Sequence, residues 1–358
     1  MTVGHDANEE KKSHGDDTLS ARDAQLWELL VQAHLEGRCL SGETLAQTLH
    51  MTRANVCKRM HALRAQGVPI SGKTHQGYTL NSAYDYLCAS DLRAHLHGAA
   101  SGFSLQVLPR CDSTNNVLKE AAHNGAPHGT VVLAEEQGTG RGRLGRSFFS
   151  PPGGVYVSLL LRPQISAQRI TGITQATAVA AAQVVERFGG RKTQIKWVND
   201  LYIEGKKCAG ILTEAGMDVE SGGVEWVIIG IGVNCFPPRG GFPAPLDQTA
   251  TAVWQTPQMQ RNALAAALIN EIAEQVLQLE QKNGSYDVYL EEYRRRSYLT
   301  GRPVRVYAAQ PYDAICMGID ENGGSAFWCH SKKTAYRPRA RGGMPFLYFS
   351  VSFRPSSL

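Results

Sequence analysis

A glycine- and arginine-rich segment at residues 137–146 holds the side chains best suited to bind an anion. Its core, residues 140–146, reads Gly-Arg-Gly-Arg-Leu-Gly-Arg and carries three guanidinium groups. Arginine can bind carboxylate or phosphate oxygens through paired hydrogen bonds, and glycine lets successive backbone N–H groups approach one ligand. The segment therefore predicts a loop that closes over an anion. Taken alone, it is also compatible with a flexible basic surface loop or an arginine–glycine tether for nucleic acid.

Four further segments carry polar side chains that could share a site with this loop. Their sequences are Asp-Ser-Thr-Asn at 112–115, Lys-Trp-Val-Asn-Asp at 196–200, Lys-Cys-Ala-Gly-Ile-Leu at 207–212 and Gly-Ile-Gly-Val-Asn at 230–234. Each has a purely structural alternative, because Ser, Thr and Asn cap helices, Asn-Asp forms turns, and a strand lysine can extend its amine to solvent. A chemical function requires that they meet.

Two predicted hairpins bring these segments together. Residues 201–203 and 207–213 form the first around a turn at 204–206, and residues 207–214 and 225–231 form the second across 215–224. Residues equidistant from a turn face one another in an antiparallel pair. This places Lys207 close to Gly232 and Asn234, and Asp200 close to Ala209. The sequence thus predicts that Lys196, Asp200, Lys207 and Asn234 converge at one end of a sheet.

Apolar runs predict the elements on either side of the loop. Residues 130–134 and 155–161 are typical of buried strands, and 116–122 has a helical pattern. A longer amphipathic helix is expected from Ser166 to Val185, with Gly189-Gly190 ending it. The loop therefore leaves a sheet edge.

The N-terminal part predicts a winged helix-turn-helix. Residues 24–65 hold three helical patterns, with Ser41 and Thr52 as caps, and two short strands are expected at 68–70 and 77–80. From Thr44 to Tyr84 there is no acidic residue, whereas five residues are Lys or Arg. This excess favours nucleic-acid binding. The expected DNA-contacting residues on the outer face of the third helix are Arg53, Asn55, Lys58 and Arg59. A protein-packing module with a solvated basic face is the alternative.

Composition indicates a soluble multidomain protein. The chain has 358 residues, 42% hydrophobic and 19% charged, and its net charge is +5. No run of eighteen apolar residues occurs and the first twelve residues are polar, so we expect a cytoplasmic protein. The eight cysteines form no C-x-x-C pair, which predicts buried thiols instead of zinc ligands or disulfides.

The order of residues 137–146 resembles the active-site loop of biotin protein ligases. The four polar segments are similar to that family's other motifs and occur in its order, with Val198 where bacterial members usually have proline. The resemblance runs from about residue 22 to about 330. It implies an α+β fold: a winged helix-turn-helix, a biotin/lipoate ligase-like catalytic domain with a mixed sheet, and a small SH3-like β-barrel. The expected divisions are a disordered leader at 1–21, the DNA-binding domain at 22–82, the catalytic domain at 83–299 and the C-terminal domain at 300–358.

The resemblance also implies the chemistry. The carboxylate of biotin would attack the α-phosphate of ATP, giving biotinyl-5′-AMP, and biotin would then pass to a lysine of the biotin carboxyl carrier protein. Two anions must approach, so cations are required. The implied catalytic residues are Lys207 and Arg143. Biotin binding is implied for Ser113, Thr114, Asn115, Gln137, Arg141, Gly142, Arg143 and Lys207. ATP binding is implied for Arg141, Arg143, Arg146, Lys196, Asn199 and Asn234, and Asp200 is the candidate ligand for Mg²⁺.

The N-terminal segment resembles the domain found in biotin ligases that also repress the biotin operon. Operator DNA and an adenylate-dependent homodimer are therefore expected partners. A biotin-sensing transcription factor without ligase activity, or a lipoate ligase, would be the alternative functions. The likeness fades after Ser325, and residues 322–358 contain six basic and no acidic residues. This tail could complete the barrel, replace its last strands or extend from it.

Overall fold

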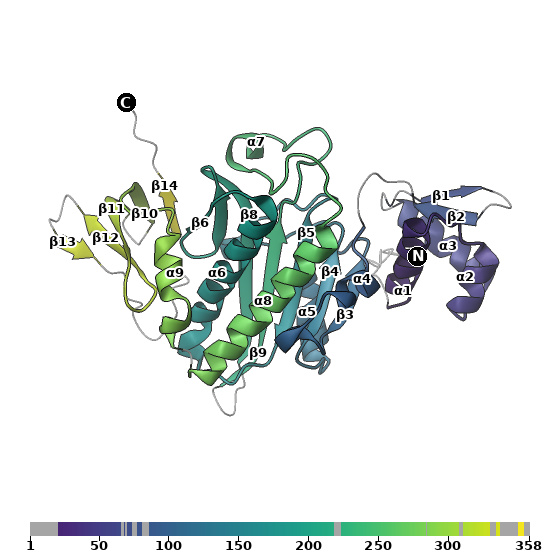
Figure 1. The fold of residues 1–358 in the computed structure, drawn as a ribbon, viewed down its shortest axis with the longest axis horizontal. Coiled ribbons are helices and arrows are strands. Elements are labelled where there is room, and N and C mark those ends of the chain that lie inside the picture. The colour runs from purple at the N-terminus through teal and green to yellow at the C-terminus, as the bar shows by residue number, and fades with distance from the viewer. Residues whose placement is uncertain are drawn as a thin grey trace, which may run out of the picture.

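The computed structural model describes residues 21–65, 68, 70–73, 77–80, 86–217, 223–283, 285–307, 311–329, 334–336 and 350–353. They form three consecutive units: a helical N-terminal unit, a central sheet with helices, and a C-terminal antiparallel sheet (Figure 1). The predicted α+β class is confirmed. Residues 1–20 of the expected leader lie outside the described residues, and Ala21 begins the first helix.

The N-terminal unit has the predicted three helices and hairpin. Its elements are α1 (Ala21–Leu35), α2 (Gly42–Thr48), α3 (Arg53–Ala65), β1 (Ile70–Lys73) and β2 (Gly77–Leu80). Both predicted caps form: Ser41 Oγ accepts a hydrogen bond from the Thr44 amide at 2.9 Å, and Thr52 Oγ1 from the Asn55 amide at 3.2 Å. The first strand runs from 70 to 73 instead of 68 to 70, because Lys73 pairs with Gly77. The tip of the expected wing, 74–76, lies outside the described residues.

A mixed sheet of seven strands forms the central unit. Its strands are β3 (Ser104–Leu108), β4 (Thr130–Ala134), β5 (Val155–Leu161), β6 (Thr193–Lys196), β7 (Asp200–Ile203), β8 (Lys206–Met217) and β9 (Val224–Val233). The order is β3-β4-β5-β9-β8-β7-β6, with β3 and β4 parallel and the other pairs antiparallel. The mixed sheet and both predicted hairpins are confirmed.

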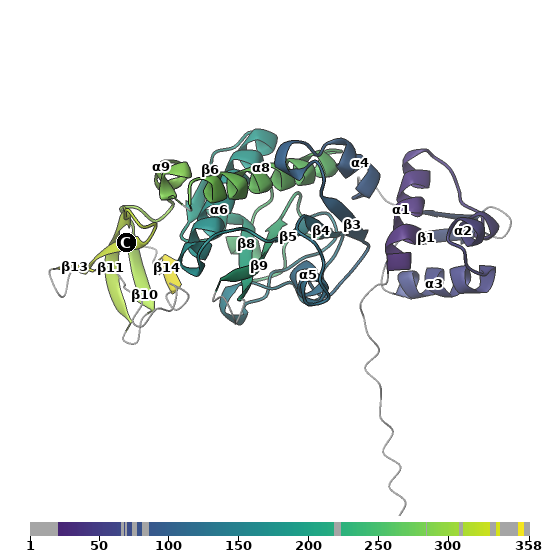
Figure 2. The same ribbon diagram turned by 90° about the horizontal axis from the view of Figure 1, so that it is seen from below.

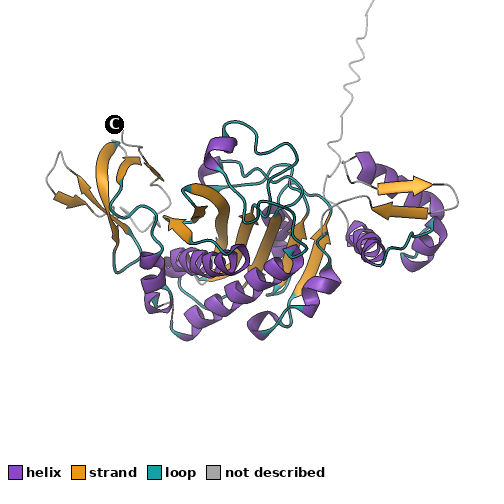
Figure 3. Cartoon of the chain, turned by 45° about the horizontal axis from the view of Figure 1, so that its top comes forward, coloured by secondary structure: helices purple, strands orange, loops and turns teal. Residues whose placement is uncertain are grey.

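Helices cover the two faces of this sheet. On one face lies α5 (Thr114–His123), and on the other lie α6 (Ile170–Gly189) and α8 (Arg261–Gln281), as Figures 2 and 3 show. Strand residues alternate between the two cores: Val132 packs in the core that α5 covers, while Val131 and Leu133 pack in the other. The predicted helix after Ser166 begins with a 3₁₀ turn, η3 (Ala167–Arg169), and its C-cap Gly190 has φ 64°.

Shorter helices join these elements. They are α4 (Ala89–Ala94), α7 (Leu246–Thr249) and α9 (Leu290–Arg295), with 3₁₀ turns η1 (Gly98–Ala100), η2 (Arg143–Gly145) and η4 (Tyr286–Val288). Among the described residues, no helix is both long enough and apolar enough to cross a membrane.

The C-terminal unit is an antiparallel sheet. Its strands are β10 (Pro303–Tyr307), β11 (Tyr312–Ile319), β12 (Ser325–Cys329), β13 (Thr334–Tyr336) and β14 (Ser350–Phe353), in the order β13-β12-β11-β10-β14. Residues 320–324 join β11 to β12 in a hairpin. Part of the atypical tail completes the sheet, because β14 pairs with β10. The Gly323 carbonyl accepts hydrogen bonds from Gln175 Nε2 at 2.5 Å and Trp197 Nε1 at 3.1 Å, which ties this sheet to the central unit.

A group of buried polar contacts, the entry clamp, fixes the start of the central unit. Arg261 Nη2 lies 2.7 Å from Glu135 Oε2, and both side chains are buried. Glu135 Oε1 accepts a hydrogen bond from the Leu87 amide at 2.5 Å, and Asn262 bonds the backbone on both sides of Leu87. Glu28 of α1 accepts bonds from the first two amides of α4. The clamp thus joins the N-terminal unit, the linker and the end of β4.

Cysteine placement differs in part from the prediction. Five thiols are buried in the described residues: Cys88, Cys111, Cys208, Cys235 and Cys316. Cys39 and Cys57 are exposed, because both lie on the surface of the small N-terminal unit, so the prediction of burial was wrong for them.

Candidate active site

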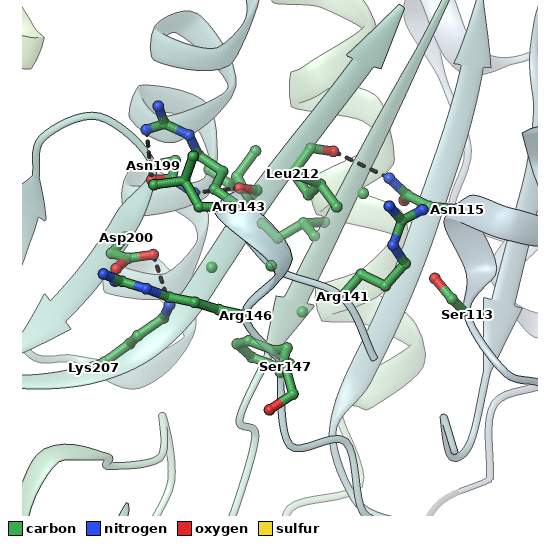
Figure 4. A pocket seen from close by; sticks show the side chains of 18 of the residues that line it. Ser113, Asn115, Arg141, Arg143, Arg146, Ser147, Asn199, Asp200, Lys207 and Leu212 are labelled. Carbon is green, nitrogen blue, oxygen red and sulfur yellow. Dashed lines mark hydrogen bonds and ion pairs between the residues drawn. The ribbon is translucent and has the colours of Figure 1, made fainter. Parts of the chain in front are cut away.

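One end of the central sheet forms a pocket beneath the arginine loop, which we define as residues 137–146 (Figure 4). The predicted residues that line it are Ser113, Thr114, Asn115, Gln137, Arg141, Gly142, Arg143, Arg146, Lys196, Asn199, Asp200 and Lys207. These residues come from α5, the loop, the β6–β7 turn and the start of β8. Five lining side chains are Lys or Arg and only Asp200 is acidic, so the pocket is suited to an anion.

Lys207 and Asp200 form the closest ion pair in the pocket. Lys207 Nζ lies 2.7 Å from Asp200 Oδ1 and 5.5 Å from the centre of the Phe148 ring. The strands place them slightly differently from the prediction, since Asp200 pairs with Gly210 and not with Ala209. A bulge between Leu201 and Tyr202 shifts the register.

Burial acts on two other cations of the pocket. Arg143 Nη1 lies 3.5 Å from Asn199 Oδ1, and Lys196 Nζ lies 3.4 Å from the Tyr202 hydroxyl. Burial lowers the pKa of the Arg143 guanidinium and that of the Lys196 ammonium, while the nearby Asp200 carboxylate opposes both shifts. Both residues therefore hold a charge that an anionic ligand would stabilise.

Hydroxyl and amide groups line the opposite wall. Gln137 Oε1 accepts hydrogen bonds from the Thr114 amide at 2.9 Å and from its hydroxyl at 3.1 Å. The Ser158 hydroxyl lies 2.7 Å from both Thr114 Oγ1 and Asn115 Oδ1. Ser158 was not predicted, and its position inside an apolar strand gave no signal of a role in the site. This wall offers neutral donors and acceptors.

Glycines form the floor of the pocket, at Gly210, Gly230 and Gly232. A Cβ atom at Gly232 would come 2.5 Å from the Phe148 ring, and one at Gly230 would collide with the Asn115 amide. The sequence carried these glycines in its motifs, but their effect on space depends on the register of β8 and β9.

Asn234 is the predicted residue that the structure does not bring into the pocket lining. The strand β9 ends at Val233, and the Asn234 side chain donates a hydrogen bond to the Thr251 carbonyl at 3.1 Å. Its amide pairs with the Cys208 carbonyl. The amide group is thus held beside the segment that follows β9.

Glu214 on β8 is a contact of the site that the sequence did not reveal. Its carboxylate accepts hydrogen bonds from Lys119 Nζ at 2.8 Å, Asn115 Nδ2 at 2.9 Å and Arg141 Nη1 at 3.4 Å. Desolvation raises the pKa of this carboxyl, but the bonds from Lys119 and Asn115 outweigh it, so that the pKa is lowered. Glu214 therefore remains ionised at neutral pH.

The predicted DNA-contacting residues divide into two groups. Arg53, Asn55 and Lys58 are exposed on α3. Arg59 is only partly exposed and forms an ion pair with Asp23 of α1. Arg53 Nε also lies 3.7 Å from Glu43 Oε2, but both of these side chains are exposed. Arg53, Asn55 and Lys58 therefore face solvent, while Arg59 helps to join α3 to α1.

Comparison with known proteins agrees with this arrangement. Residues 107–234 match the biotin/lipoate A/B protein ligase family, and residues 25–79 match a helix-turn-helix domain. The bifunctional ligase/repressor BirA of Bacillus subtilis strain 168 is 39% identical over 231 residues, covering 64% of this chain and 70% of the relative. BirA of Escherichia coli K12 is 32% identical over 301 residues, covering 82% of this chain and 89% of the relative. The chain belongs to this bifunctional ligase/repressor family.

Solved structures show the same fold. The biotin protein ligase from Aquifex aeolicus, in complex with biotin and ATP, aligns with a TM-score of 0.58 at 23% identity and covers 70% of this chain and 99% of its own. The family assignment made from the loop and the four polar segments is confirmed by the family match and by the two BirA relatives. The chain has both parts of a bifunctional member, a ligase domain and a helix-turn-helix domain.

Proposed function

We propose that the pocket joins biotin to ATP, forming biotinyl-5′-AMP and pyrophosphate, and then transfers biotin to a lysine of the biotin carboxyl carrier protein. The observation that carries this proposal is the gathering of five cationic side chains, from the loop, β6 and β8, around a wall of neutral polar groups. Cations offset the repulsion between the biotin carboxylate and the α-phosphate. The neutral wall suits a ureido ring, which needs donors and acceptors together.

Roles follow from the two sides of the pocket. Lys207, with three donors on a flexible stem, binds the carboxylate and follows its oxygen into the acyl phosphate, while Arg143 retains the adenylate. The residues proposed for biotin are Ser113, Thr114, Asn115, Gln137, Arg141, Gly142, Arg143 and Lys207. The residues proposed for ATP are Arg141, Arg143, Arg146, Lys196 and Asn199.

Mg²⁺ fits the donor set of the pocket. Asp200 is the only carboxylate that lines it, and Asn199 is the adjacent residue in sequence. Mg²⁺ commonly uses one or two protein oxygens and takes its other ligands from phosphate and water. Asp200 would hold the ion, which would neutralise phosphate charge when bound. Among the described residues, no group of three His, Cys, Asp or Glu residues is placed to bind a metal.

We also propose that the N-terminal unit binds operator DNA as a biotin-responsive repressor in the cytoplasm. Arg53, Asn55 and Lys58 are exposed on the third helix of a helix-turn-helix, which is the element that enters the major groove. A homodimer of the adenylate-bound protein would present two such helices to a palindromic site.

Label transfer tests the ligase. Purified protein is incubated with ATP, Mg²⁺, labelled biotin and a biotin carboxyl carrier domain, and labelled lipoate replaces biotin in a parallel reaction. We expect ATP-dependent biotin incorporation and none of lipoate. Absence of biotin transfer, together with ligand-dependent DNA binding, would instead identify a sensor without ligase activity.

A further inference from the structure

Glu214 lies behind the pocket wall and contacts two residues that line it. Its side chain is 19% exposed, and its three donors come from two elements: Asn115 and Lys119 from α5 and Arg141 from the arginine loop. Glu214 itself does not line the pocket. A carboxylate in this position acts on a ligand only through its partners.

The first partner, Asn115, is held at both ends of its amide. Nδ2 donates to Glu214, and Oδ1 accepts from the Ser158 hydroxyl at 2.7 Å. The Asn115 side chain is buried, so rotation of the amide would leave both neighbours without these bonds. Glu214 thus fixes which face of Asn115 forms the wall.

The second partner, Arg141, ties the loop to the sheet. Arg141 Nη1 lies 2.8 Å from Asn116 Oδ1 and 3.4 Å from Glu214 Oε1. The loop contains four glycines, which leave many backbone conformations open to it. A charge-assisted bond at Arg141 removes part of that freedom, and Arg143 and Arg146 follow within five residues.

We propose that Glu214 is a positioning residue that fastens the arginine loop to β8 through Arg141, so that the other loop arginines face the pocket before a ligand arrives. The expected effect on biotin binding rests on the proposed function. The contact between Glu214 and Arg141 itself forms without any substrate. In a variant without it, only a fraction of molecules would have the loop in place, and the apparent affinity for biotin would fall by that fraction.

Trypsin digestion of the intact protein without ligand tests the fastening. Cleavage after Arg143 and Arg146 is followed by mass spectrometry in wild type and in Glu214→Gln, which keeps the size of the side chain and removes its charge. We expect cleavage roughly fivefold faster in the variant, because proteolysis tracks the population of the open loop. In the transfer assay, KM for biotin should rise while kcat changes less.

Matched variants separate the loop from the helix. Lys119→Met removes the other cation on the same carboxylate and should leave loop cleavage unchanged. Arg141→Gln should accelerate cleavage as Glu214→Gln does, and the double variant should add nothing further. The proposal is overturned if Glu214→Gln is cleaved at the wild-type rate, if Lys119→Met has the same effect, or if the two substitutions add.

The design also separates this proposal from the ligase assignment. If Glu214→Gln lowers the thermal midpoint strongly, the comparison of Arg141→Gln with Asn116→Ala still measures the fastening, because both variants lose the Arg141–Asn116 bond and only the first loses the bond to Glu214. If the wild-type protein transfers no biotin, the proposed ligase function is wrong. The trypsin cleavage rates still test the role of Glu214, because they are measured without substrate.

Discussion

The ammonium of Lys207 already has a carboxylate partner, Asp200, at 2.7 Å. A second carboxylate can join this pair because an ammonium group offers three donors that need not lie in one plane. The side chains of Lys207 and Asp200 are 31% and 24% exposed, so an incoming ligand can reach them. The donors of a guanidinium lie in one plane, so an arginine at this position would be less able to bind Asp200 and a ligand carboxylate together.

Replacing Lys207 by alanine should abolish adenylate formation and leave the fold intact. The change removes the cation at the proposed carboxylate position, and electrostatic groups of this kind contribute on the order of 10²–10³ in rate. Pyrophosphate release from biotin and ATP is the measurement, with circular dichroism to check folding. Release close to the wild-type rate would show that Lys207 is not in the reaction.

Lys196 should give ATP binding an alkaline limit. Burial lowers the pKa of its ammonium, so Lys196 loses its proton as pH rises at a lower pH than an ordinary lysine does. Below this pKa the cation is present, and above it phosphate loses a partner. As pH increases, we expect KM for ATP to begin to rise at a pH below about 10.4, which is the usual pKa of lysine. Lys196→Arg should move that rise to higher pH, and an unchanged profile would exclude Lys196 as its source.

At the scale of elements, apolar pattern predicted the strands well and register poorly. Strands β4 and β5 were expected with the bounds that the structure has, because a buried strand is a continuous apolar run. The bulge after Leu201 has no such signal, and it moved the partner of Asp200 by one residue. The contacts of Glu214 could not be predicted for a related reason. Its partners lie 73 to 99 positions away, and a sequence does not show which face of β8 meets them.

Strand β9 tolerates no side chain at Gly230. A methyl group there would occupy the space of the Asn115 amide, so Gly230→Ala should displace Asn115 and weaken biotin binding more than ATP binding. Overpacking of this type commonly costs about 1–3 kcal/mol of stability. Thermal unfolding and calorimetric titration with biotin would measure the two effects. Gly240→Ala is the control, because a Cβ atom there would meet no other atom within 4 Å. Its φ of 88° means that any loss of stability in this control comes from backbone strain and not from overpacking. Wild-type affinity for biotin in Gly230→Ala would contradict this account of the floor.

At the scale of the whole molecule, the three units lie in a row with the DNA-binding candidate at one end and the C-terminal sheet at the other (Figure 1). The charge excess of the N-terminal unit was visible in the sequence. The partly buried ion pair of Arg59 with α1 was not visible, because Asp23 lies 36 positions from Arg59 and precedes the acid-free stretch. The structure therefore gives the four predicted DNA-binding residues different roles.

Arg53 and Lys58 should govern DNA binding, and Arg59 should govern stability. Replacing the exposed pair by alanine should weaken operator binding and reduce its salt dependence, by about 0.9 units of slope for each phosphate that the protein no longer neutralises, with little change in melting. Arg59→Ala should lower the melting temperature, because it leaves Asp23 without this partner. Gel-shift titrations at several salt concentrations would measure the change in DNA binding, and thermal melts would measure the change in stability. An unchanged salt slope in the double variant would place the DNA elsewhere.

The entry clamp decides where the chain can be shortened. A fragment starting at residue 83 keeps the Leu87 amide on Glu135, whereas one starting at 89 removes it and leaves a buried carboxylate oxygen without that donor. Removing a donor from a buried acceptor costs about 1–3 kcal/mol. Residues 83–358 should therefore melt higher than residues 89–358, although the six removed residues precede every strand of the central sheet. Equal melting would mean that the clamp adds nothing to the isolated ligase domain. If residues 83–358 melt higher, an isolated ligase domain made for engineering must include a short piece of the linker that joins it to the N-terminal unit.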